Sequence, residues 1–372
     1  MDSNKEIIVV SGINFFEGGP LTIMQDVLQK LSRNFSDTYR IIALVNNKSL
    51  YLTENIEFVE FPKSRTSWFF RLYYEFIYFK SFSKKLKPKF WLSMHDITPN
   101  VVCKDQFVYC HNPAPFFKPK KEDIKYGLST YAFSKLYKYL YGINIKKNKN
   151  VIVQQDWLRE EFTKRWNLQN VIVAYPEIKL NKTEINPPLK KGENKIKTLF
   201  YPSFPRSFKN FELICNAFEL LDEKNQQKIK IYLTINDGLN KYAKDIVNKF
   251  KKHPNICFIG ILKRDEVFKY YANVDALIFP SRLETWGLPI TEFKNYNKPI
   301  LAANLPYAKE TVNSYDKAIF FDTNSPKELA ELYKKFIEEK LDFAKTNEII
   351  PSKPFVKGWQ ELLEYLFNKN AA

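Results

Sequence analysis

The feature that most constrains the fold is an alternation of short apolar runs with amphipathic helical patterns along most of the 372 residues. Residues 7–11 form an apolar run, a glycine turn follows at Gly18 and Gly19, and apolar residues then recur at helical spacing over residues 21–31. A strand, a loop and a helix in this order are typical of a mostly parallel α/β sheet. Further strands are predicted at residues 40–45, 56–61, 90–94, 106–110, 151–154 and 171–174, with a helix at 156–166.

The chain length favours two domains. Residues 176–197 interrupt the alternation with Pro187-Pro188 and a lysine-rich run, as a linker would. Beyond them, strands are predicted at 198–201, 229–235, 256–259, 276–280 and 299–303, and helices at 211–221, 242–251, 265–272, 289–296 and 326–340. We therefore predict a first domain at residues 1–178, a linker at 179–196 and a second domain at 197–350. Residues 351–372 are expected to form a terminal helix that packs back toward the first domain, with the amphipathic segment 356–367 following the completed sheet.

The loop at residues 279–292 carries the most chemical information. Glu284 and Glu292 flank a predicted strand-to-helix turn that contains Gly287 and, near the first helical position, Pro289. A glycine and a helix start at this place present backbone N–H groups to an anion such as a diphosphate. Ionised carboxylates beside such a site would accept hydrogen bonds from sugar or ribose hydroxyls. The alternative is that Glu284 only caps the helix and Glu292 is an exposed helical residue.

This loop resembles the signature of glycosyltransferase family 4, a family of retaining enzymes. Residues 255–262, 265–267 and 271–281 are similar to the family's run of strand, glycine loop, helix and strand, and residues 298–306 resemble the family's segment after its second glutamate. The resemblance implies a GT-B fold, in which two Rossmann-like, doubly wound α/β domains face a central cleft. Two departures are Thr285-Trp286, in place of the family's small and aromatic pair, and residues 294–297, in place of a run of small residues.

The resemblance also implies site residues. Arg206 and Lys209, on the loop after the second domain's first strand, would grip the donor diphosphate, and Glu284 would orient the donor sugar. His111, at the end of a first-domain strand, would lie near that sugar; taken alone, it could equally satisfy backbone groups there. His111, Arg206, Lys209 and Glu284 are the predicted catalytic set. The predicted donor-binding set is Gly18, Gly19, Gly260, Leu262, Thr285, Trp286, Gly287, Leu288 and Glu292, the last for the ribose.

Metal and cofactor sites are not predicted. The four cysteines lack the close pairing of zinc or redox motifs, there are only three histidines, and no Asp-x-Asp triplet is present. We expect buried, reduced thiols, no metal and no cofactor. The substrate is expected to be a UDP-, GDP- or dTDP-sugar.

A formal net charge of +17 favours anionic partners without naming one. Residues 62–90 interleave aromatic and basic side chains, and Glu75 is their one acid. This pattern suits docking on an anionic membrane that holds a lipid-linked acceptor. A core helix with a cationic solvent face is the alternative. No nucleic-acid motif is present, so nucleic acid is not an expected partner. Without a long apolar run, we predict a cytoplasmic protein, peripheral on the inner face of the cytoplasmic membrane if this segment docks.

Together these observations predict retaining transfer of a hexose-type sugar to a glycan or lipid-linked saccharide. The expected setting is bacterial lipopolysaccharide, capsule or other surface polysaccharide biosynthesis. The alternatives are a GT-B sugar-nucleotide epimerase, a phosphorylase, or a non-catalytic basic binding protein.

Overall fold

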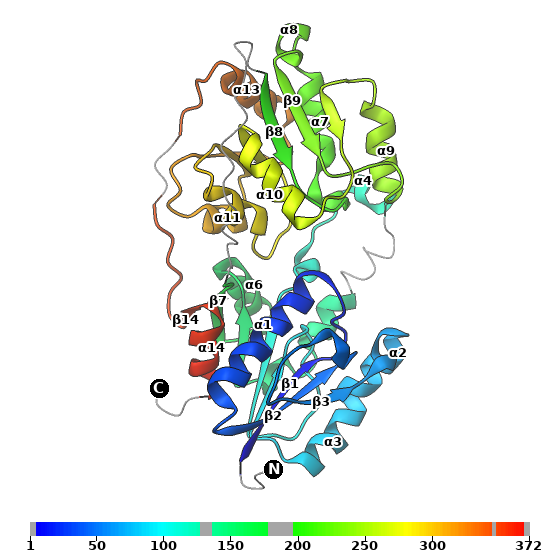
Figure 1. Cartoon of the computed structure of the whole chain (residues 1–372), viewed down its shortest axis with the longest axis vertical. Coiled ribbons are helices and arrows are strands. Elements are labelled where there is room, and N and C mark those ends of the chain that lie inside the picture. The colour runs from blue at the N-terminus through cyan, green and yellow to red at the C-terminus, as the bar shows by residue number, and fades with distance from the viewer. Residues whose placement is uncertain (1–4, 127–135, 178–195, 344–346, 368–372) are drawn as a thin grey trace. The chain divides into compact units, whose positions relative to one another are not determined.

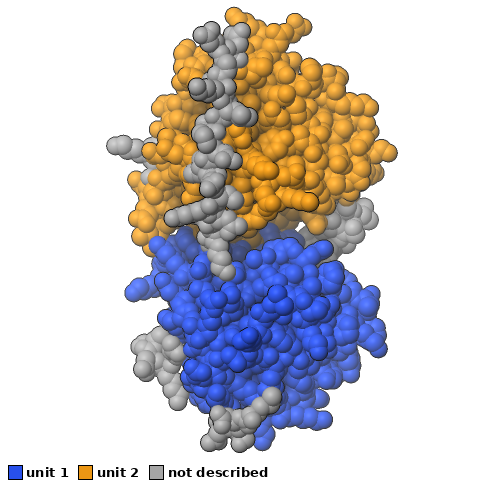
Figure 2. Space-filling view, viewed as in Figure 1, with its two compact units in different colours: residues 1–116, 133–178, 351–372 blue, residues 117–132, 179–350 orange. Residues whose placement is uncertain are grey.

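The structure is a computed structural model that describes residues 5–126, 136–177, 196–343 and 347–367. The chain divides into two compact units (Figure 2). The first consists of residues 1–116, 133–178 and 351–372, and the second of residues 117–132 and 179–350. Apart from Ile196, the predicted linker 179–196 lies outside the described residues.

The first unit is built on an eight-stranded sheet with the order β14-β7-β6-β5-β4-β1-β2-β3, in which every pairing is parallel. Its strands are β1 (Glu6–Gly12), β2 (Tyr39–Val45), β3 (Glu57–Glu60), β4 (Phe90–Ser93), β5 (Asp105–Cys110), β6 (Asn150–Val153), β7 (Val171–Tyr175) and β14 (Phe355–Lys357). Successive residues such as Ile8, Val9 and Val10 are all fully buried. Both faces of the sheet are therefore covered, which explains why the strands appear in the sequence as continuous apolar runs.

Helices and shorter helical turns cover this sheet (Figure 1). They are α1 (Gly18–Phe35), α2 (Trp68–Tyr73), α3 (Phe79–Leu86), α6 (Asp156–Trp166), α14 (Gly358–Phe367) and the turns η1 (Lys48–Leu50), η2 (Pro62–Arg65), η3 (Tyr74–Tyr78), η4 (Ala114–Phe116) and η5 (Ile145–Lys147). The turn η3 is a wide, π-type turn that joins α2 to α3. The predicted segment 62–90 is thus a series of helical pieces.

The terminal segment differs from its prediction. The amphipathic stretch 356–367 was expected to follow a completed sheet, but Val356 pairs with Ala174 of β7 and so belongs to the sheet. The chain then continues into α14, which contacts α1 (Figure 1). Phe367 packs on Phe35 with ring centroids 5.9 Å apart. A strand of three residues is too short to show a period in sequence, and its hydrogen bonds exist only because β7 offers an unpaired edge.

The second unit has a six-stranded parallel sheet with the order β10-β9-β8-β11-β12-β13. Its strands are β8 (Lys197–Tyr201), β9 (Ile229–Leu233), β10 (Ile256–Phe258), β11 (Ala276–Phe279), β12 (Ile300–Ala303) and β13 (Ala318–Phe321). Its helices and turns are η6 (Ser207–Lys209), α7 (Phe211–Glu219), α8 (Glu223–Gln226), α9 (Lys241–Phe250), α10 (Arg264–Asn273), α11 (Leu288–Lys294), α12 (Pro306–Val312) and α13 (Pro326–Ile337). The strand β13 and the helix α12 were not predicted.

A short segment from the first half of the chain packs on this second unit. It contains α4 (Lys121–Ile124), which Figure 1 shows beside α9. Ring contacts join Phe117 to Phe208 at 5.6 Å and Tyr126 to Tyr242 at 5.0 Å. The prediction of residues 1–178 as one continuous domain did not include this excursion, because these contacts join residues far apart in sequence.

Both sheets reverse their strand order once, between β1 and β4 in the first unit and between β8 and β11 in the second. This order confirms the predicted pair of doubly wound, Rossmann-like units. In such sheets the crevice beyond the carboxyl ends of the strands at the reversal is where ligands bind. The loops that leave β1, β4, β8 and β11 are therefore the places to look for a site.

Candidate active site

In the second unit, the loops after β8 and β11 are joined by an ion pair between Lys209 Nζ and Glu284 Oε1. Both side chains are mostly buried. The Tyr201 hydroxyl donates to the carbonyl of Lys209 at 2.9 Å. Asn210, in the left-handed conformation (φ 62°), donates to the carbonyls of Pro280 at 3.3 Å and Thr323 at 2.9 Å. The fold thus brings two of the four predicted catalytic residues together and anchors the loops that carry them.

Arg206 lies on the same loop as Lys209 but is exposed. No described residue forms a hydrogen bond or ion pair with its guanidinium, whose Cζ lies 5.7 Å from the Phe204 ring centroid. Arg206 lines a hollow of about 290 Å³ with aromatic walls that include Tyr126 and Tyr242. Neither glutamate of the loop lines it. Arg206 is therefore a cation available to an anionic ligand.

Glu292 is buried in α11, so the alternative of an exposed helical residue is wrong. Arg264 Nη2 donates to its Oε1 at 2.7 Å and the Tyr271 hydroxyl to its Oε2 at 3.1 Å. Burial raises the pKa of Glu292, and the charge of Arg264 opposes that rise. Each oxygen already has a donor, so a ribose hydroxyl would share the carboxylate with Arg264 or Tyr271.

The turn before α11 has a backbone that favours glycine, because Gly287 has φ 85°. Trp286 is 8% exposed and its Nε1 donates to the Thr291 hydroxyl at 3.0 Å. Its indole N–H is therefore used within the protein. Thr285 is half-buried, whereas Leu288 is exposed.

The loop after β10 also needs a glycine. Gly260 has φ 73°, and a β-carbon there would lie 3.1 Å from Asn236 Nδ2. Leu262, two residues further, is half-buried. The predicted donor-binding residues of the second unit thus follow the carboxyl ends of β10 and β11.

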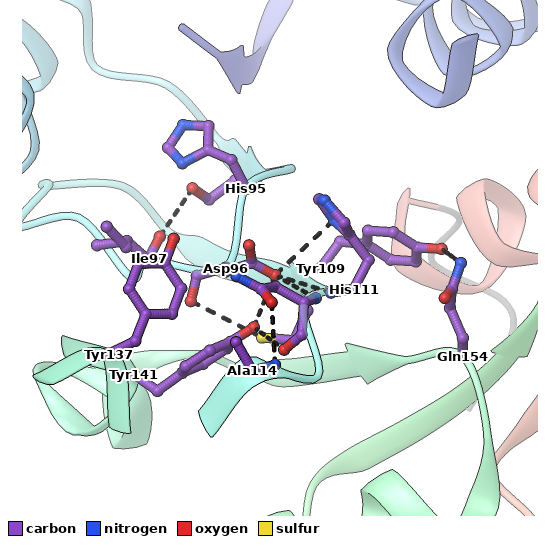
Figure 3. A network of polar contacts seen from close by, with 12 residues as sticks. His95, Asp96, Ile97, Tyr109, His111, Ala114, Tyr137, Tyr141 and Gln154 are labelled. Carbon is purple, nitrogen blue, oxygen red and sulfur yellow. Dashed lines mark hydrogen bonds and ion pairs between the residues drawn. The ribbon is translucent and has the colours of Figure 1, made fainter. Parts of the chain in front are cut away.

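In the first unit, a hollow of about 450 Å³ lies among the loops that follow β1, β4 and β5. His111 lines it and sits on a tightly held backbone (Figure 3). Asp96 Oδ1 accepts from the N–H groups of His111 at 2.8 Å and Asn112 at 3.1 Å, and from the Tyr141 hydroxyl at 2.7 Å. The imidazole Nδ1 of His111 is buried, has no hydrogen-bond partner and lies 3.8 Å from Asp96 Oδ1. The backbone N–H of His111, rather than its ring, forms the hydrogen bond to Asp96 just after the end of β5.

The glycine turn stands at the start of α1. Gly18 has φ 68°, and a β-carbon on either Gly18 or Gly19 would meet no other atom within 4 Å. The space beside both glycines is open. Only Gly18 has a backbone that disfavours other residues.

A buried polar cluster beneath the first-unit hollow was missed by the sequence analysis. Arg71 Nη2 donates to the His95 carbonyl at 3.1 Å, and Glu75 Oε1 lies 3.2 Å from His95 Nε2. Burial raises the pKa of Glu75 to about 8, although Arg71 opposes the rise, and burial lowers the pKa of His95. One sequence feature could have indicated this cluster: Glu75 is the only acid in the basic, aromatic segment 62–90.

In the described part of the chain, no group of three or more His, Cys, Asp or Glu side chains is arranged to hold a metal ion. No helix there has the length and apolar character needed to cross a membrane. All four cysteines are free, with Cys110 and Cys215 buried.

Residues 181–351 match the family model described as Glycosyl transferases group 1. This match lies almost entirely within the second unit. The O-antigen biosynthesis glycosyltransferase WclY of Escherichia coli is 26% identical over 149 residues, which cover 40% of this chain and 39% of WclY. An uncharacterized 41.2 kDa protein in the cps region of Klebsiella pneumoniae is 26% identical over 147 residues, 38% of each chain. Both matches span only about two fifths of these relatives.

Solved structures share the fold across nearly the whole chain. The lipopolysaccharide outer core galactosyltransferase WaaB has a TM-score of 0.63 at 10% identity, and WaaG, a glycosyltransferase involved in lipopolysaccharide biosynthesis, has 0.61 at 12%. Each match covers 98% of this chain and 96% of the other. Anabaena HepE in complex with UDP has 0.60 at 14%, covering 90% of both chains. At such identities the likeness shows the fold, which is GT-B.

Proposed function

We propose that this protein is a metal-independent, retaining glycosyltransferase of family 4 that moves a hexose-type sugar from a nucleotide sugar to a glycan or lipid-linked acceptor. The observation that carries the proposal is the pairing of Lys209 with Glu284 at the strand-order reversal of the unit that matches the group 1 model. An ammonium and a carboxylate side by side can serve a diphosphate and a sugar hydroxyl respectively.

On the donor side, Arg206 and Lys209 bind the diphosphate. When the C1–O bond to the diphosphate breaks, the negative charge on the leaving oxygens rises, and these two cations stabilise it. The acceptor oxygen forms the new bond to C1 on the same face, and its proton passes to a phosphate oxygen of the leaving group. Glu284 orients the sugar and Glu292 the ribose, while the turns at Gly260 and Gly287 let the backbone approach the nucleotide closely.

In the first unit, His111 is proposed to contact the donor sugar, and Gly18 and Gly19 the diphosphate. His111 lines the first-unit hollow, and the space beside both glycines is open, which supports these roles.

The biosynthetic setting is inferred from the relatives and neighbours. WclY is named for O-antigen biosynthesis, and WaaB and WaaG for lipopolysaccharide. We infer a role in bacterial surface polysaccharide or lipopolysaccharide assembly. HepE structures contain UDP or UDP-glucose, which makes UDP-sugars the first donors to test.

The helical segment 62–90 is proposed to dock on the cytoplasmic face of an anionic membrane. Its outer face carries an aromatic and aliphatic stripe, with Phe69 73% and Ile77 62% exposed, and Trp68, Tyr73 and Tyr78 partly so. Lys80, Lys84, Lys85 and Lys87 are exposed beyond it. Its inner face packs on the core through the fully buried Phe79. The inner face therefore agrees with the alternative of a core helix, and the docking proposal rests on the outer face alone. Lys89 is different, because it is buried and paired with Glu6.

The experiment is a donor screen on the full chain in the presence of EDTA. UDP-, GDP- and dTDP-sugars are tested for thermal stabilisation and for slow hydrolysis or transfer. One donor should stabilise the wild type, and Lys209→Gln and Glu284→Gln should lower turnover about 100-fold. Lys224→Gln, an exposed lysine of the same unit, is the matched control. Epimerised donor or phosphate-dependent release would favour the other GT-B activities. No response to any donor would overturn the proposal.

A further inference from the structure

The first-unit hollow contains two arginines that the proposed donor chemistry does not use. Arg65 and Arg71 both line it, together with Phe16, Tyr137 and His111. Arg65 is exposed and forms no ion pair with any described residue, and its guanidinium Cζ lies 4.3 Å from the Phe16 ring centroid. Arg71 is 7% exposed, and its Nε is buried without a hydrogen-bond partner. A buried guanidinium with an unused donor is costly unless a ligand or partner neutralises it.

None of the described acids around the hollow forms an ion pair with either arginine. Asp96 and Glu17 both line the hollow. Asp96 accepts from two backbone N–H groups and the Tyr141 hydroxyl, and Glu17 is exposed. Burial raises the pKa of Glu75 to about 8, so this carboxyl group is largely protonated at neutral pH. The two guanidiniums are therefore not in direct contact with a carboxylate.

Arg71 also connects the hollow to the aromatic stripe. Arg71 Cζ lies 4.9 Å from the ring centroid of Trp68, which is 43% exposed at the start of α2. A cation that stacks on an aromatic ring at a membrane-facing surface suits a ligand with a charged head and an apolar tail. The donor diphosphate, by contrast, already has Arg206 and Lys209 in the second unit.

We propose that this hollow binds a phosphate group carried by the acceptor, through Arg65 and Arg71. The inference rests on the proposed glycosyltransferase function and deepens it: the acceptor is an amphiphilic phosphate, such as a lipid-linked phosphate or diphosphate, rather than a neutral glycan. Its phosphate lies between the two guanidiniums, its tail runs along Trp68 and the stripe, and the sugar hydroxyl to be modified points toward His111.

The test is titration calorimetry on the full chain with saturating UDP present, which occupies the donor site. The probes are hexyl phosphate and hexyl glucoside, which share a tail and differ in charge. Hexyl phosphate should bind and hexyl glucoside should not. Arg65→Gln should weaken phosphate binding about tenfold, since it removes a charge-assisted hydrogen bond. Glu17→Gln should strengthen it about threefold by removing a nearby like charge. Arg33→Gln, an exposed arginine of α1, is the matched control and should change nothing.

Equal binding of both probes, or phosphate binding that Arg65→Gln leaves unchanged, would overturn the proposal. If UDP displaces hexyl phosphate and Lys209→Gln weakens both ligands, the anion site is the donor's and the proposal also fails. Inorganic phosphate is the third probe. If it binds as tightly as hexyl phosphate, the site takes a free anion and the amphiphilic acceptor is excluded. If the protein binds hexyl phosphate in an Arg65-dependent way but binds no nucleotide, the glycosyltransferase function is excluded and the anion site is still supported.

Discussion

Arg282 Nη2 donates to Asp123 Oδ1 at 2.6 Å, and both side chains are buried although 159 residues separate them. Arg282 lies two residues before Glu284 on the loop after β11, and it also donates to the carbonyl of Ser207 at 3.0 Å. Asp123 belongs to α4. The pair therefore ties the short segment from the first half of the chain to both loops of the proposed donor site.

Breaking this pair should destabilise the second unit. Asp123→Ala leaves the Arg282 guanidinium buried without its partner, so we expect the free energy of unfolding to fall by about 3 kcal/mol. Because Arg282 positions the loop of Glu284, kcat/KM for the donor should also fall about tenfold. Urea denaturation and steady-state kinetics measure the two effects.

The same segment offers a control for this prediction. Lys125 and Asp245 form an exposed ion pair at 3.7 Å, and Asp245→Asn should change stability by less than about 0.5 kcal/mol. Arg282→Met combined with Asp123→Ala should cost less than the sum of the single changes, because no buried charge then remains unpaired. Additive effects would show that the pair contributes nothing of its own.

The two glycines at the start of α1 should respond differently to alanine. Both have open space for a β-carbon, but only Gly18 has a positive φ, of 68°. Gly18→Ala should lower the free energy of unfolding by about 1 kcal/mol, whereas Gly19→Ala should be neutral or stabilise α1 by a few tenths to about 1 kcal/mol. Thermal denaturation of both variants checks this. Equal effects would mean that the strain at Gly18 is relieved by local rearrangement.

Glu75 should make stability depend on pH. Its folded-state pKa of about 8 exceeds the ordinary value of 4.5, so the folded protein holds the proton more tightly than the unfolded chain. The stabilising contribution is complete below about pH 4.5 and is lost as pH rises toward 8. Arg71 and His95 face the carboxyl group; burial also lowers the pKa of His95, which favours the neutral form of this histidine.

Glu75→Gln tests this dependence because glutamine keeps the shape and does not titrate. Between pH 5 and pH 8, the wild type should lose about 3 kcal/mol more stability than the variant. Urea denaturation at the two pH values gives the difference. Parallel pH profiles for both proteins would show that Glu75 is ionised in the folded state at neutral pH.

The aromatic stripe of residues 68–78 should control membrane binding. Phe69→Ser with Ile77→Ser should weaken binding to vesicles of phosphatidylcholine and phosphatidylglycerol about tenfold, since both side chains lose apolar contact with lipid. Leu52→Ser removes a fully exposed apolar residue outside the segment and is the control. Sedimentation with vesicles measures the affinity.

The positive charges of the lysines in segment 62–90 should also contribute to vesicle binding. Reversal of Lys84, Lys85 and Lys87 to glutamate should weaken binding to these vesicles and have no effect with pure phosphatidylcholine. Lys89 is left unchanged, because it is itself buried and pairs with Glu6, so its reversal could reduce binding by disturbing the fold. Vesicle binding that neither set of changes reduces would exclude the docking role.

The sequence alone determined the architecture, because the information for it is local. Apolar runs such as residues 7–11 and helical spacing such as 156–166 each specify one element, and their repeated alternation specifies parallel sheets. The strand and helix borders in the structure lie within a few residues of those predicted. The turns at Gly260 and Gly287 were likewise visible, because a positive φ selects glycine at one position.

Tertiary structure alone decided which charged residues became buried partners. Lys209 and Glu284 meet because β8 and β11 are neighbours in the sheet, and Asp123 meets Arg282 because a short segment crosses to the second unit. Arg71, Glu75 and Lys89 belong to a segment that was expected either to dock on a membrane or to be a core helix with a cationic solvent face, yet all three are buried. Burial and pairing depend on what the rest of the chain places against a side chain, and no local pattern carries that information.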